Sequence, residues 1–199
     1  MLDFTVPLAH APLPPRSRER FAPRAVADTQ GEHISVQDGR VLRLRPIAAT
    51  DVAALQRCFT RLSAEDIRRR FLHAMAELPK AMAVGLCQVD PTQETALALL
   101  DDSAHPAEIR GVGRIFVDEV ADSAEFSVLV ERNWGHLGLG GLLLRRLIDD
   151  SRRRGLAELW GCVLMENQPM LDLCHDLGFA RQLMPNEPGV VRVTLRLQP

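Results

Sequence analysis

Residues 125–141 read EFSVLVERNWGHLGLGG and join two different patterns. In the first half, bulky apolar side chains alternate at Phe126, Val128 and Val130, which predicts a β-strand. Four glycines then follow within seven residues, and the apolar spacing beyond them predicts a helix over 142–154. A strand that leads through a glycine loop into a helix is an arrangement that commonly binds phosphate.

The glycine loop has two physical properties that suit an anion. The first turn of a helix carries backbone N–H groups without an intrahelical acceptor, together with a partial positive charge. Gly138, Gly140 and Gly141 lack a Cβ, so a pyrophosphate can approach their backbone closely. We therefore expect the loop to bind the phosphates of a ligand through main-chain groups.

Other glycine motifs fit this loop less well. A Walker loop ends in Gly-Lys-Ser or Gly-Lys-Thr, whereas here Gly140 and Gly141 are followed by Leu142. A dinucleotide-binding fingerprint needs a third glycine where Leu143 stands, and it belongs to the first βα turn of its domain. A plain glycine turn between a strand and a helix remains an alternative, although such a turn needs fewer glycines.

The loop resembles motif A of the GNAT superfamily of N-acetyltransferases. That motif has Gln or Arg, two residues, Gly, one residue, and then Gly or Ala, and residues 135–140 match it at Gly138 and Gly140. The sequence departs from the motif at Gly135, where the family has Gln or Arg. This departure removes one side-chain contact but leaves the backbone cradle.

A second stretch follows in the order that the superfamily has. Residues 163–167 (VLMEN) look like the family's fifth strand and its asparagine, and residues 177–179 (LGF) look like the Gly-Phe that follows its fourth helix. The resemblance implies an α/β (α+β) fold with a single GNAT domain. Its sheet is expected to be mixed and mostly antiparallel, splayed between strands 4 and 5, with helices on both faces.

The composition fits one globular domain. The chain has 199 residues, of which 46% are hydrophobic, and this is enough for one substantial core. Residues 1–32 are rich in proline and arginine and show no sustained periodicity, so we expect a disordered or extended N-terminal arm. The GNAT acetyltransferase domain is expected to occupy residues 33–199.

Charge, apolar runs and cysteine spacing limit the partners. The formal net charge is −2 and the pI is about 6.3, so no basic surface argues for nucleic acid. No apolar run approaches the roughly 20 residues of a membrane span, so no membrane partner is expected. The four cysteines show no paired spacing that would indicate a metal site or a disulfide framework. We expect a cytoplasmic protein with reduced thiols and no bound metal.

The remaining elements are predicted from periodicity and turn signals. Thr50 is expected to cap a first helix, and Ser63 with Asp66 to begin a second helix that continues to Met75. The three arginines at 68–70 lie off its apolar face, so we expect a solvated face there. Further strands are expected at 42–45, 95–100, 109–118, 159–164 and 190–197, and further helices at 79–87 and 168–177.

The resemblance to the family implies a binding mode for acetyl-CoA, the expected cosubstrate. The pantetheine arm enters between strands 4 and 5, where backbone groups of Val128, Leu129 and Val130 would bind the thioester and the pantetheine amides. The side-chain amide of Asn167 would bind the pantetheine backbone. The phosphates would lie across the residues of the loop, namely Gly135, His136, Leu137, Gly138, Leu139, Gly140 and Gly141.

Glu125 is the residue that we expect to perform acid–base chemistry. A central strand is normally apolar on both faces, so a carboxylate there needs a partner or a cleft. A lysine ammonium has a pKa near 10.4, so a base has to collect the proton of the attacking amine. In the alternative interpretation, Glu125 ends a strand and forms an ion pair with Arg114.

The resemblance is closest to the acetyltransferase domain of bacterial Pat-type protein lysine acetyltransferases, which acetylate acyl-CoA synthetases. It covers roughly residues 41–197. It implies that Glu125 is the general base, because this is where that branch has its catalytic glutamate. The residues that carry it are 124–130 (AEFSVLV), 44–46 (LRP), 62–63 (LS) and 70–71 (RF), together with the Gly-Leu-Gly at 138–140.

The group that protonates the leaving thiolate stays open. Many family members use a tyrosine four residues before the glycine of Gly-Phe, but this position is Cys174 and the chain contains no tyrosine. Cys174 and water are the alternatives, and a cysteine that is simply packed in the core is the competing interpretation of Cys174. His136 and His175 are further candidates, while Trp134 is expected to pack rather than to stack on a base.

Three functions remain open. We expect an N-acetyltransferase that moves the acetyl group of acetyl-CoA to a protein lysine, for example on an acyl-CoA synthetase, by direct attack of the amine on the thioester. Acetylation of a small-molecule amine is an alternative within enzymes. A non-catalytic CoA-binding regulatory module is an alternative from another class. The sequence leaves a homodimer open.

Overall fold

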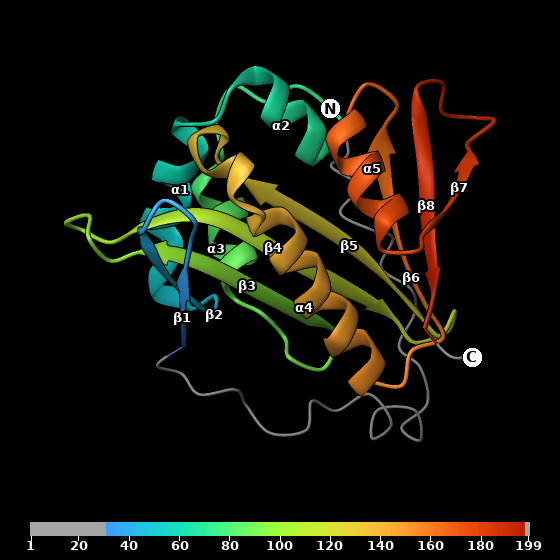
Figure 1. Cartoon of the computed structure of the whole chain (residues 1–199), viewed down its shortest axis with the longest axis horizontal. Helices are drawn as coiled ribbons and strands as arrows, with labels where there is room; N and C mark the ends of the chain where they lie inside the picture. The colour runs from blue at the N-terminus through green and yellow to red at the C-terminus, as the bar shows by residue number, and fades with distance from the viewer. Residues whose placement is uncertain (1–30, 198–199) are drawn as a thin grey trace.

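A computed structural model of the chain describes residues 31–197 as one mixed sheet with helices packed on both of its faces (Figure 1). The strands are β1 (Glu32–Ser35), β2 (Val41–Pro46), β3 (Glu94–Asp101), β4 (Glu108–Asp118), β5 (Ser123–Val130), β6 (Glu158–Leu164), β7 (Ala180–Leu183) and β8 (Val190–Arg196). The α-helices are α1 (Val52–Thr60), α2 (Ala64–Phe71), α3 (Lys80–Cys87), α4 (Leu139–Arg153) and α5 (Gln168–Asp176). Two 3-10 helices, η1 (Ala49–Asp51) and η2 (Arg132–Leu137), precede α1 and α4.

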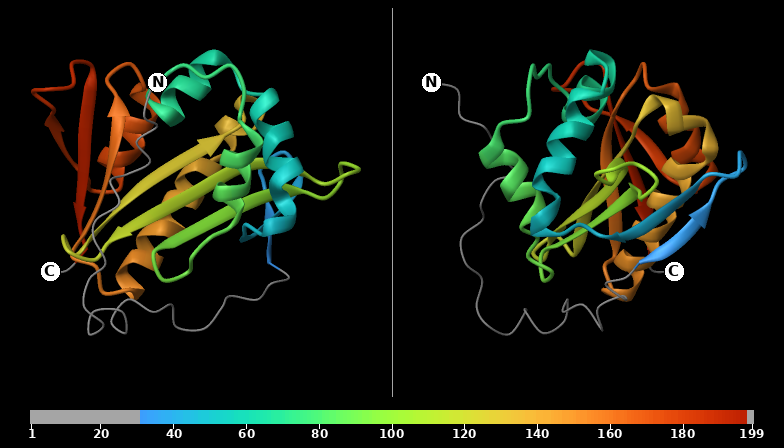
Figure 2. Two further views of the ribbon diagram at one scale, coloured as in Figure 1. Left: turned by 180° about the vertical axis from the view of Figure 1, so that it is seen from behind. Right: turned by 90° about the vertical axis from the view of Figure 1, so that its left-hand side faces the viewer.

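The sheet opens between β5 and β6. In the order β1-β2-β3-β4-β5-β6-β8-β7, the pair β5–β6 is parallel and its neighbours on either side are antiparallel. Residues 123–125 of β5 pair with residues 158–160 of β6, and beyond them the two strands diverge while β6 stays paired with β8 (Figures 1 and 2). The predicted mixed, mostly antiparallel sheet with a splay at this place is confirmed.

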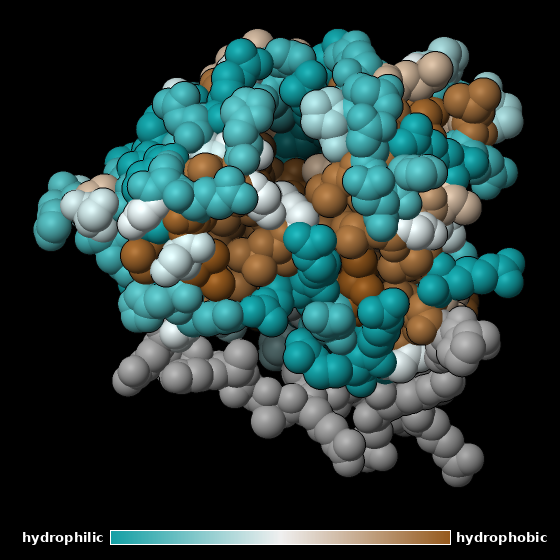
Figure 3. Space-filling view, in the orientation of Figure 1, coloured by the Kyte–Doolittle hydropathy of each residue, from teal (hydrophilic) through white to brown (hydrophobic). Residues whose placement is uncertain are grey.

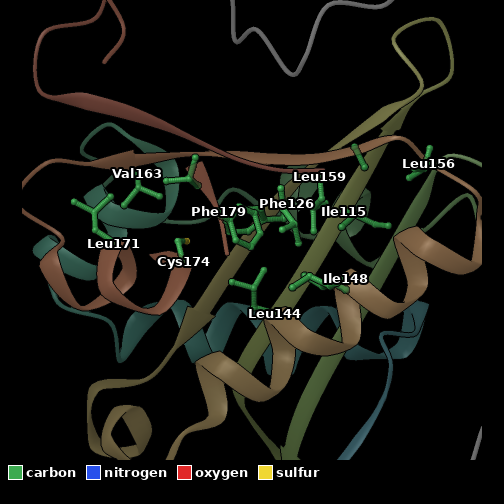
Figure 4. Packing of buried hydrophobic residues seen from close by; sticks show 14 of the residues in the cluster. Ile115, Phe126, Leu144, Ile148, Leu156, Leu159, Val163, Leu171, Cys174 and Phe179 are labelled. Carbon is green, nitrogen blue, oxygen red and sulfur yellow. The ribbon is translucent and has the colours of Figure 1, made fainter. Parts of the chain in front are cut away.

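The two faces of the sheet bury separate apolar clusters because the side chains of β5 alternate between them. Phe126 belongs to a cluster that includes residues of α4 and α5, such as Leu144 and Leu171 (Figure 4). Leu129 points the other way and packs against the cluster formed by α1, α2 and α3. Figure 2 shows α1 to α3 on one side of the sheet and α4 on the other. The predicted helices on both faces are therefore confirmed.

Three predicted element ends are wrong. Thr50 does not cap a helix, because it lies within η1 and the carboxylate of Asp51 accepts the Ala48 N–H at 2.8 Å. The second helix stops at Phe71, since Leu72 adopts a left-handed backbone with φ of 60°. The glycine loop is also shorter than expected, because α4 already begins at Leu139.

Two strands at the edges of the sheet were not predicted. β7 pairs with β8 although all four of its residues are exposed, so it lacks the alternation that marks a strand. β1 pairs with β2 and begins at Glu32, within the predicted N-terminal arm. The rest of that predicted arm, residues 1–30, lies outside the described residues.

Candidate active site

A cleft with a volume of about 450 Å³ opens where β5 and β6 diverge. Its walls come from β5, β6, α2, α5 and the N-terminus of α4. The space-filling view shows the surface hollowed between α2 and α5 (Figure 3). Segments distant in the sequence thus form one site at the split in the sheet.

The glycine loop forms the N-terminus of α4 at one end of this cleft. Gly138 precedes the helix with φ of 74°, a left-handed conformation that a side chain disfavours. The first main-chain bond of the helix joins Leu142 N–H to the Gly138 carbonyl at 3.0 Å. The N–H groups of Leu139, Gly140 and Gly141 therefore precede the helical bonding pattern and have no intrahelical acceptor. These donors can meet an anion.

Most of the predicted site residues line the cleft. This is true of Glu125, Val128, Leu129, Val130, Gly135, Gly138, Gly140, Gly141 and Asn167. Three loop residues do not line it: His136 is exposed, Leu137 is partly buried, and Leu139 is 1% exposed in a core cluster. Any contact of Leu139 with a ligand in the cleft would thus have to use its main chain.

Glu125 is the last residue of β5 that pairs with β6, and it lies opposite Trp160. Burial raises the pKa of Glu125 above its ordinary value, and the positive charges of Arg70 and Arg192 partly offset this rise. Within residues 31–197, its carboxylate forms no hydrogen bond or ion pair. The proposed ion pair with Arg114 is wrong, because Arg114 donates to Glu94 and to the Leu86 carbonyl.

The three arginines of α2 differ from one another, so the predicted solvated face is only partly correct. Arg68 is 52% exposed and pairs with Glu166 of the segment before α5 at 2.7 Å. Arg70 is partly buried and lines the cleft with Glu125. Apolar periodicity does not distinguish Arg70 from Arg68, because the difference depends on how α2 packs beside the cleft.

The cysteine in the cleft is Cys162. Cys174 is fully buried in the core between the sheet and α5, and burial raises the pKa of its thiol to about 12 (Figure 4). Cys162 of β6 lines the cleft instead, and burial, followed by the charge of Glu125, raises the pKa of its thiol. His175 is exposed, and Trp134 is buried in a core cluster as expected.

Asn167 and Arg145 complete the ends of the cleft. Asn167 is the residue before α5, and its side chain makes no capping bond to that helix. Arg145 of α4, which sequence analysis missed, is exposed and stands beside Gly141: a Cβ on this glycine would lie 3.1 Å from an Arg145 guanidinium nitrogen. The position of Arg145, one helical turn after Gly141, could have predicted this contact, since residues four apart share a helix face.

Comparison with known proteins identifies the family. Residues 55–179 match the model of the acetyltransferase (GNAT) family. The chain belongs to this family. The GNAT chain is 31% identical to an acetyltransferase of Pseudomonas aeruginosa over 166 residues, which cover 82% of the chain and 89% of that relative. It is also 39% identical to the ribosomal protein bS18 alanine N-acetyltransferase of Escherichia coli, over 27% of the chain and 36% of that enzyme.

Solved GNAT structures have the same fold. The GNAT domain of S. lividans PAT superposes with a TM-score of 0.76 at 23% identity, covering 87% of this chain and all of that domain. A cAMP-binding acyltransferase from Mycobacterium smegmatis superposes with a TM-score of 0.59 at 20% identity, and this chain spans about half of its length, 51%. The yncA protein of Salmonella typhimurium, solved with acetyl-CoA, superposes with a TM-score of 0.57 at 21% identity over 79% of this chain and 94% of that one.

The family assignment establishes the class of reaction. This GNAT chain is an acyltransferase that uses acetyl-CoA, as the resemblance in its sequence implied. Within residues 31–197, no helix is long and apolar enough to cross a membrane. In the same part of the chain, no group of three or more His, Cys, Asp and Glu side chains is placed to hold a metal ion.

Proposed function

We propose that this GNAT enzyme acetylates a lysine amine of another protein, with Glu125 as the general base. The proposal rests above all on the Glu125 carboxylate, which lines the cleft at the point where β5 and β6 part. A carboxylate without a partner in a partly buried cleft is poised to accept a proton. We further propose a cytoplasmic setting, where acetyl-CoA and protein acceptors are both available.

The end of the cleft at α4 fits the diphosphate of acetyl-CoA. The N–H groups of Leu139, Gly140 and Gly141 would donate to phosphate oxygens, and the positive end of the helix would favour their charge. Arg145 would add a charge-assisted hydrogen bond from the side. His136, with the main chain of Gly135 and Leu137, would border the phosphates on the side of η2.

The open edge of β5 fits the pantetheine arm. Beyond Glu125, β5 has no partner on the β6 side, so main-chain groups of Val128, Leu129 and Val130 on that edge are available to a ligand. The amide of Asn167, free of any capping bond, would bind the same arm from α5. Acetyl-CoA supplies the acetyl carbonyl as a thioester, and an N–H of the β5 edge would stabilise the oxyanion during attack.

The transfer step needs a proton acceptor and a proton donor. The acceptor nitrogen forms a bond to the carbonyl carbon and the carbon–sulfur bond breaks, while Glu125 takes the proton of the amine. The leaving thiolate then takes a proton from water or from the Cys162 thiol. Cys162 lines the cleft and is protonated at neutral pH, but its raised pKa makes it a weaker acid than an ordinary thiol, so water is the better donor. Cys174 is not placed for it, because its side chain is enclosed in the core.

A protein acceptor is supported by the open cleft and by the relatives. The cleft opens at the surface between α2 and α5, where a lysine side chain could enter (Figure 3). The S. lividans PAT domain has the same fold, and the name of the E. coli relative specifies a protein amine. The sequence also resembles the Pat type over roughly residues 41–197.

The test is to incubate the protein with acetyl-labelled acetyl-CoA and a cell lysate, and to follow the label. Label on lysine residues of proteins is expected, and Glu125→Gln should lower its rate by about 10²- to 10⁴-fold while CoA still binds. Glu77→Gln, an exposed glutamate, is the matched control and should leave the rate unchanged. Label that ends in the small-molecule fraction would overturn the protein acceptor, and an unchanged rate in Glu125→Gln would remove Glu125 from the mechanism.

A further inference from the structure

Charged and titratable side chains approach Glu125 and the cleft from several elements. They are Asp66, Arg69 and Arg70 from α2, Arg114 from β4, Arg145 from α4, Cys162 from β6 and Arg192 from β8. Arg145 stands at the phosphate end, beside Gly141. Arg70 and Arg192 act electrostatically on Glu125, and Glu125 acts on Cys162, while Arg114 acts on Arg70.

Most of the charges around Glu125 already have partners. Asp66 accepts from Ser63, Arg69 pairs with Glu65, Arg114 pairs with Glu94, and Arg192 pairs with Glu158. Cys162 is a neutral thiol in contact with the sulfur of Met184 at 3.8 Å. Arg70 differs from its neighbours: within residues 31–197 its guanidinium forms no ion pair or hydrogen bond and lies over the Phe71 ring, 4.8 Å from its centroid.

An unpaired guanidinium in this position disfavours folding. Burial lowers the pKa of Arg70 to about 10, the charge of Arg114 adds to the decrease, and the charge of Glu125 opposes it. Even a partly buried charge without a counter-ion costs stability, whereas an arginine on a solvated face does not. Arg68, two residues earlier on α2, has such an exposed position. Residues that destabilise a fold are commonly retained at functional sites.

We propose that Arg70 is a positioning residue that holds Glu125 in its ionised, proton-accepting form. This inference rests on the role proposed above for Glu125. A carboxylate in an apolar cleft tends to take up a proton, and a nearby positive charge opposes this. Because Arg70 is not in direct contact with Glu125, the carboxylate oxygens stay free to accept the proton of the acceptor amine. A direct ion pair would occupy those oxygens.

Arg192 is the other positive charge that acts on Glu125, and it offers a comparison. Its guanidinium pairs with Glu158 at 3.3 Å and lies 4.0 Å from the centre of the Trp160 ring. The negative charge of Glu158 offsets part of its field at Glu125. The unpaired Arg70 should therefore have the larger effect on Glu125.

The experiment measures the protonation of Glu125 directly, by NMR titration of the protein with carboxyl-labelled glutamate. In Arg70→Gln, the midpoint of the Glu125 titration should rise by about one pH unit, the lower end of the range for a nearby opposite charge. The acid limb of the pH profile, in which the rate of label transfer to lysate protein falls with decreasing pH, should move to higher pH by the same amount. At a pH below this limb, the rate of transfer should therefore fall about tenfold. Arg70→Lys should restore most of both shifts because it keeps the positive charge.

Two controls separate this role from a structural one. Arg68→Gln, on the same helix, should leave the titration of Glu125 unchanged, and Arg192→Gln should shift it less than Arg70→Gln. Thermal unfolding of Arg70→Gln at neutral pH should occur at the wild-type temperature or above it, because an unpaired charge is removed. A simple loss of folding would lower that temperature.

The outcomes distinguish the two proposals. If Glu125→Gln lowers transfer by about 10²- to 10⁴-fold but Arg70→Gln leaves the Glu125 titration and the acid limb in place, Arg70 has no such role and the role of Glu125 stands. If Glu125→Gln transfers acetyl groups at the wild-type rate, the proposed mechanism falls and the inference about Arg70 falls with it.

Discussion

Phe126 lies against Gly161 at the point where β5 and β6 separate. A Cβ on Gly161 would stand 2.7 Å from Cε1 and 2.9 Å from Cζ of the Phe126 ring. The ring is held in place, because it is 5% exposed and packs edge-on against Phe179 with the ring centroids 5.4 Å apart. Phe126 is also the first residue of β5 beyond the segment that pairs with β6. The contact therefore marks the place from which the cleft opens.

Gly161→Ala should destabilise the protein and distort the cleft. The added methyl group forces the Phe126 ring or β6 to shift, and overpacking of this kind costs about 1–3 kcal/mol. The temperature of thermal unfolding and the affinity for CoA should both decrease. Gly85→Ala in α3 is the control, because a Cβ there meets nothing within 4 Å and alanine favours a helix. Equal unfolding temperatures for Gly161→Ala and the wild type would contradict the role of this contact.

Gly140→Ala separates ligand binding from folding. In the structure, a Cβ at this position would meet only Leu173, at 3.9 Å, so the folded chain accommodates it. A diphosphate bound to the main chain of α4 would clash with the added methyl group. CoA affinity should therefore fall by about tenfold or more, equivalent to ~1.4 kcal/mol. Isothermal titration should show this loss while the unfolding temperature stays at or above that of the wild type. Unchanged CoA affinity would mean that the phosphates bind elsewhere.

Arg145→Gln should weaken CoA binding through the loss of a charge-assisted hydrogen bond to phosphate. Such bonds contribute about 1.5–3 kcal/mol, so the dissociation constant should rise by at least about tenfold and depend less on salt. Arg146→Gln is the matched control on the next position of α4, since Arg146 pairs with Glu32. Acetyl-pantetheine, which lacks the diphosphate, should be used equally well by Arg145→Gln and the wild type. A similar loss with both ligands would contradict a phosphate contact.

Glu125→Gln should make the protein more stable at neutral pH although it removes the proposed general base. The pKa of Glu125 is raised in the folded state, so the ionised carboxylate destabilises the fold. This cost is absent below the unfolded pKa, near 4.3, and is fully present above the folded pKa. Unfolding curves of the variant and the wild type should thus coincide at low pH and separate as pH rises, with the variant the more stable. A less stable variant at pH 7 would contradict the burial of an ionised Glu125.

The central part of the fold follows from local patterns. Alternating apolar residues predicted β5, and the helical spacing after the glycines predicted most of α4, because the apolar face of each packs against the other in the core. The capping signal of Ser63 and Asp66 also predicted the start of α2 correctly. β7 escaped prediction, since an exposed edge strand is held by main-chain pairing to β8 and needs no apolar pattern.

The site was only partly predictable. The strand that bears Glu125 and the glycines of α4 are close in sequence, so one continuous stretch predicts both ends of the cleft. Arg70 and Cys162 come from distant segments, and no local pattern relates them to Glu125. The sequence pointed to Cys174 because of its position before Gly-Phe, but α5 turns that side chain into the core.

By itself, the sequence determined the order of the central elements, the acetyltransferase family and the glycine-rich start of α4, because each depends on residues that are near one another in the chain. The tertiary structure decided which charge stands beside the carboxylate of Glu125. That choice arises from the packing of α2 over the gap between β5 and β6, which leaves Arg70 without a counter-ion while its neighbours on the helix pair at the surface. Electrostatic relationships of this kind depend on distances in space, and a linear pattern does not encode them.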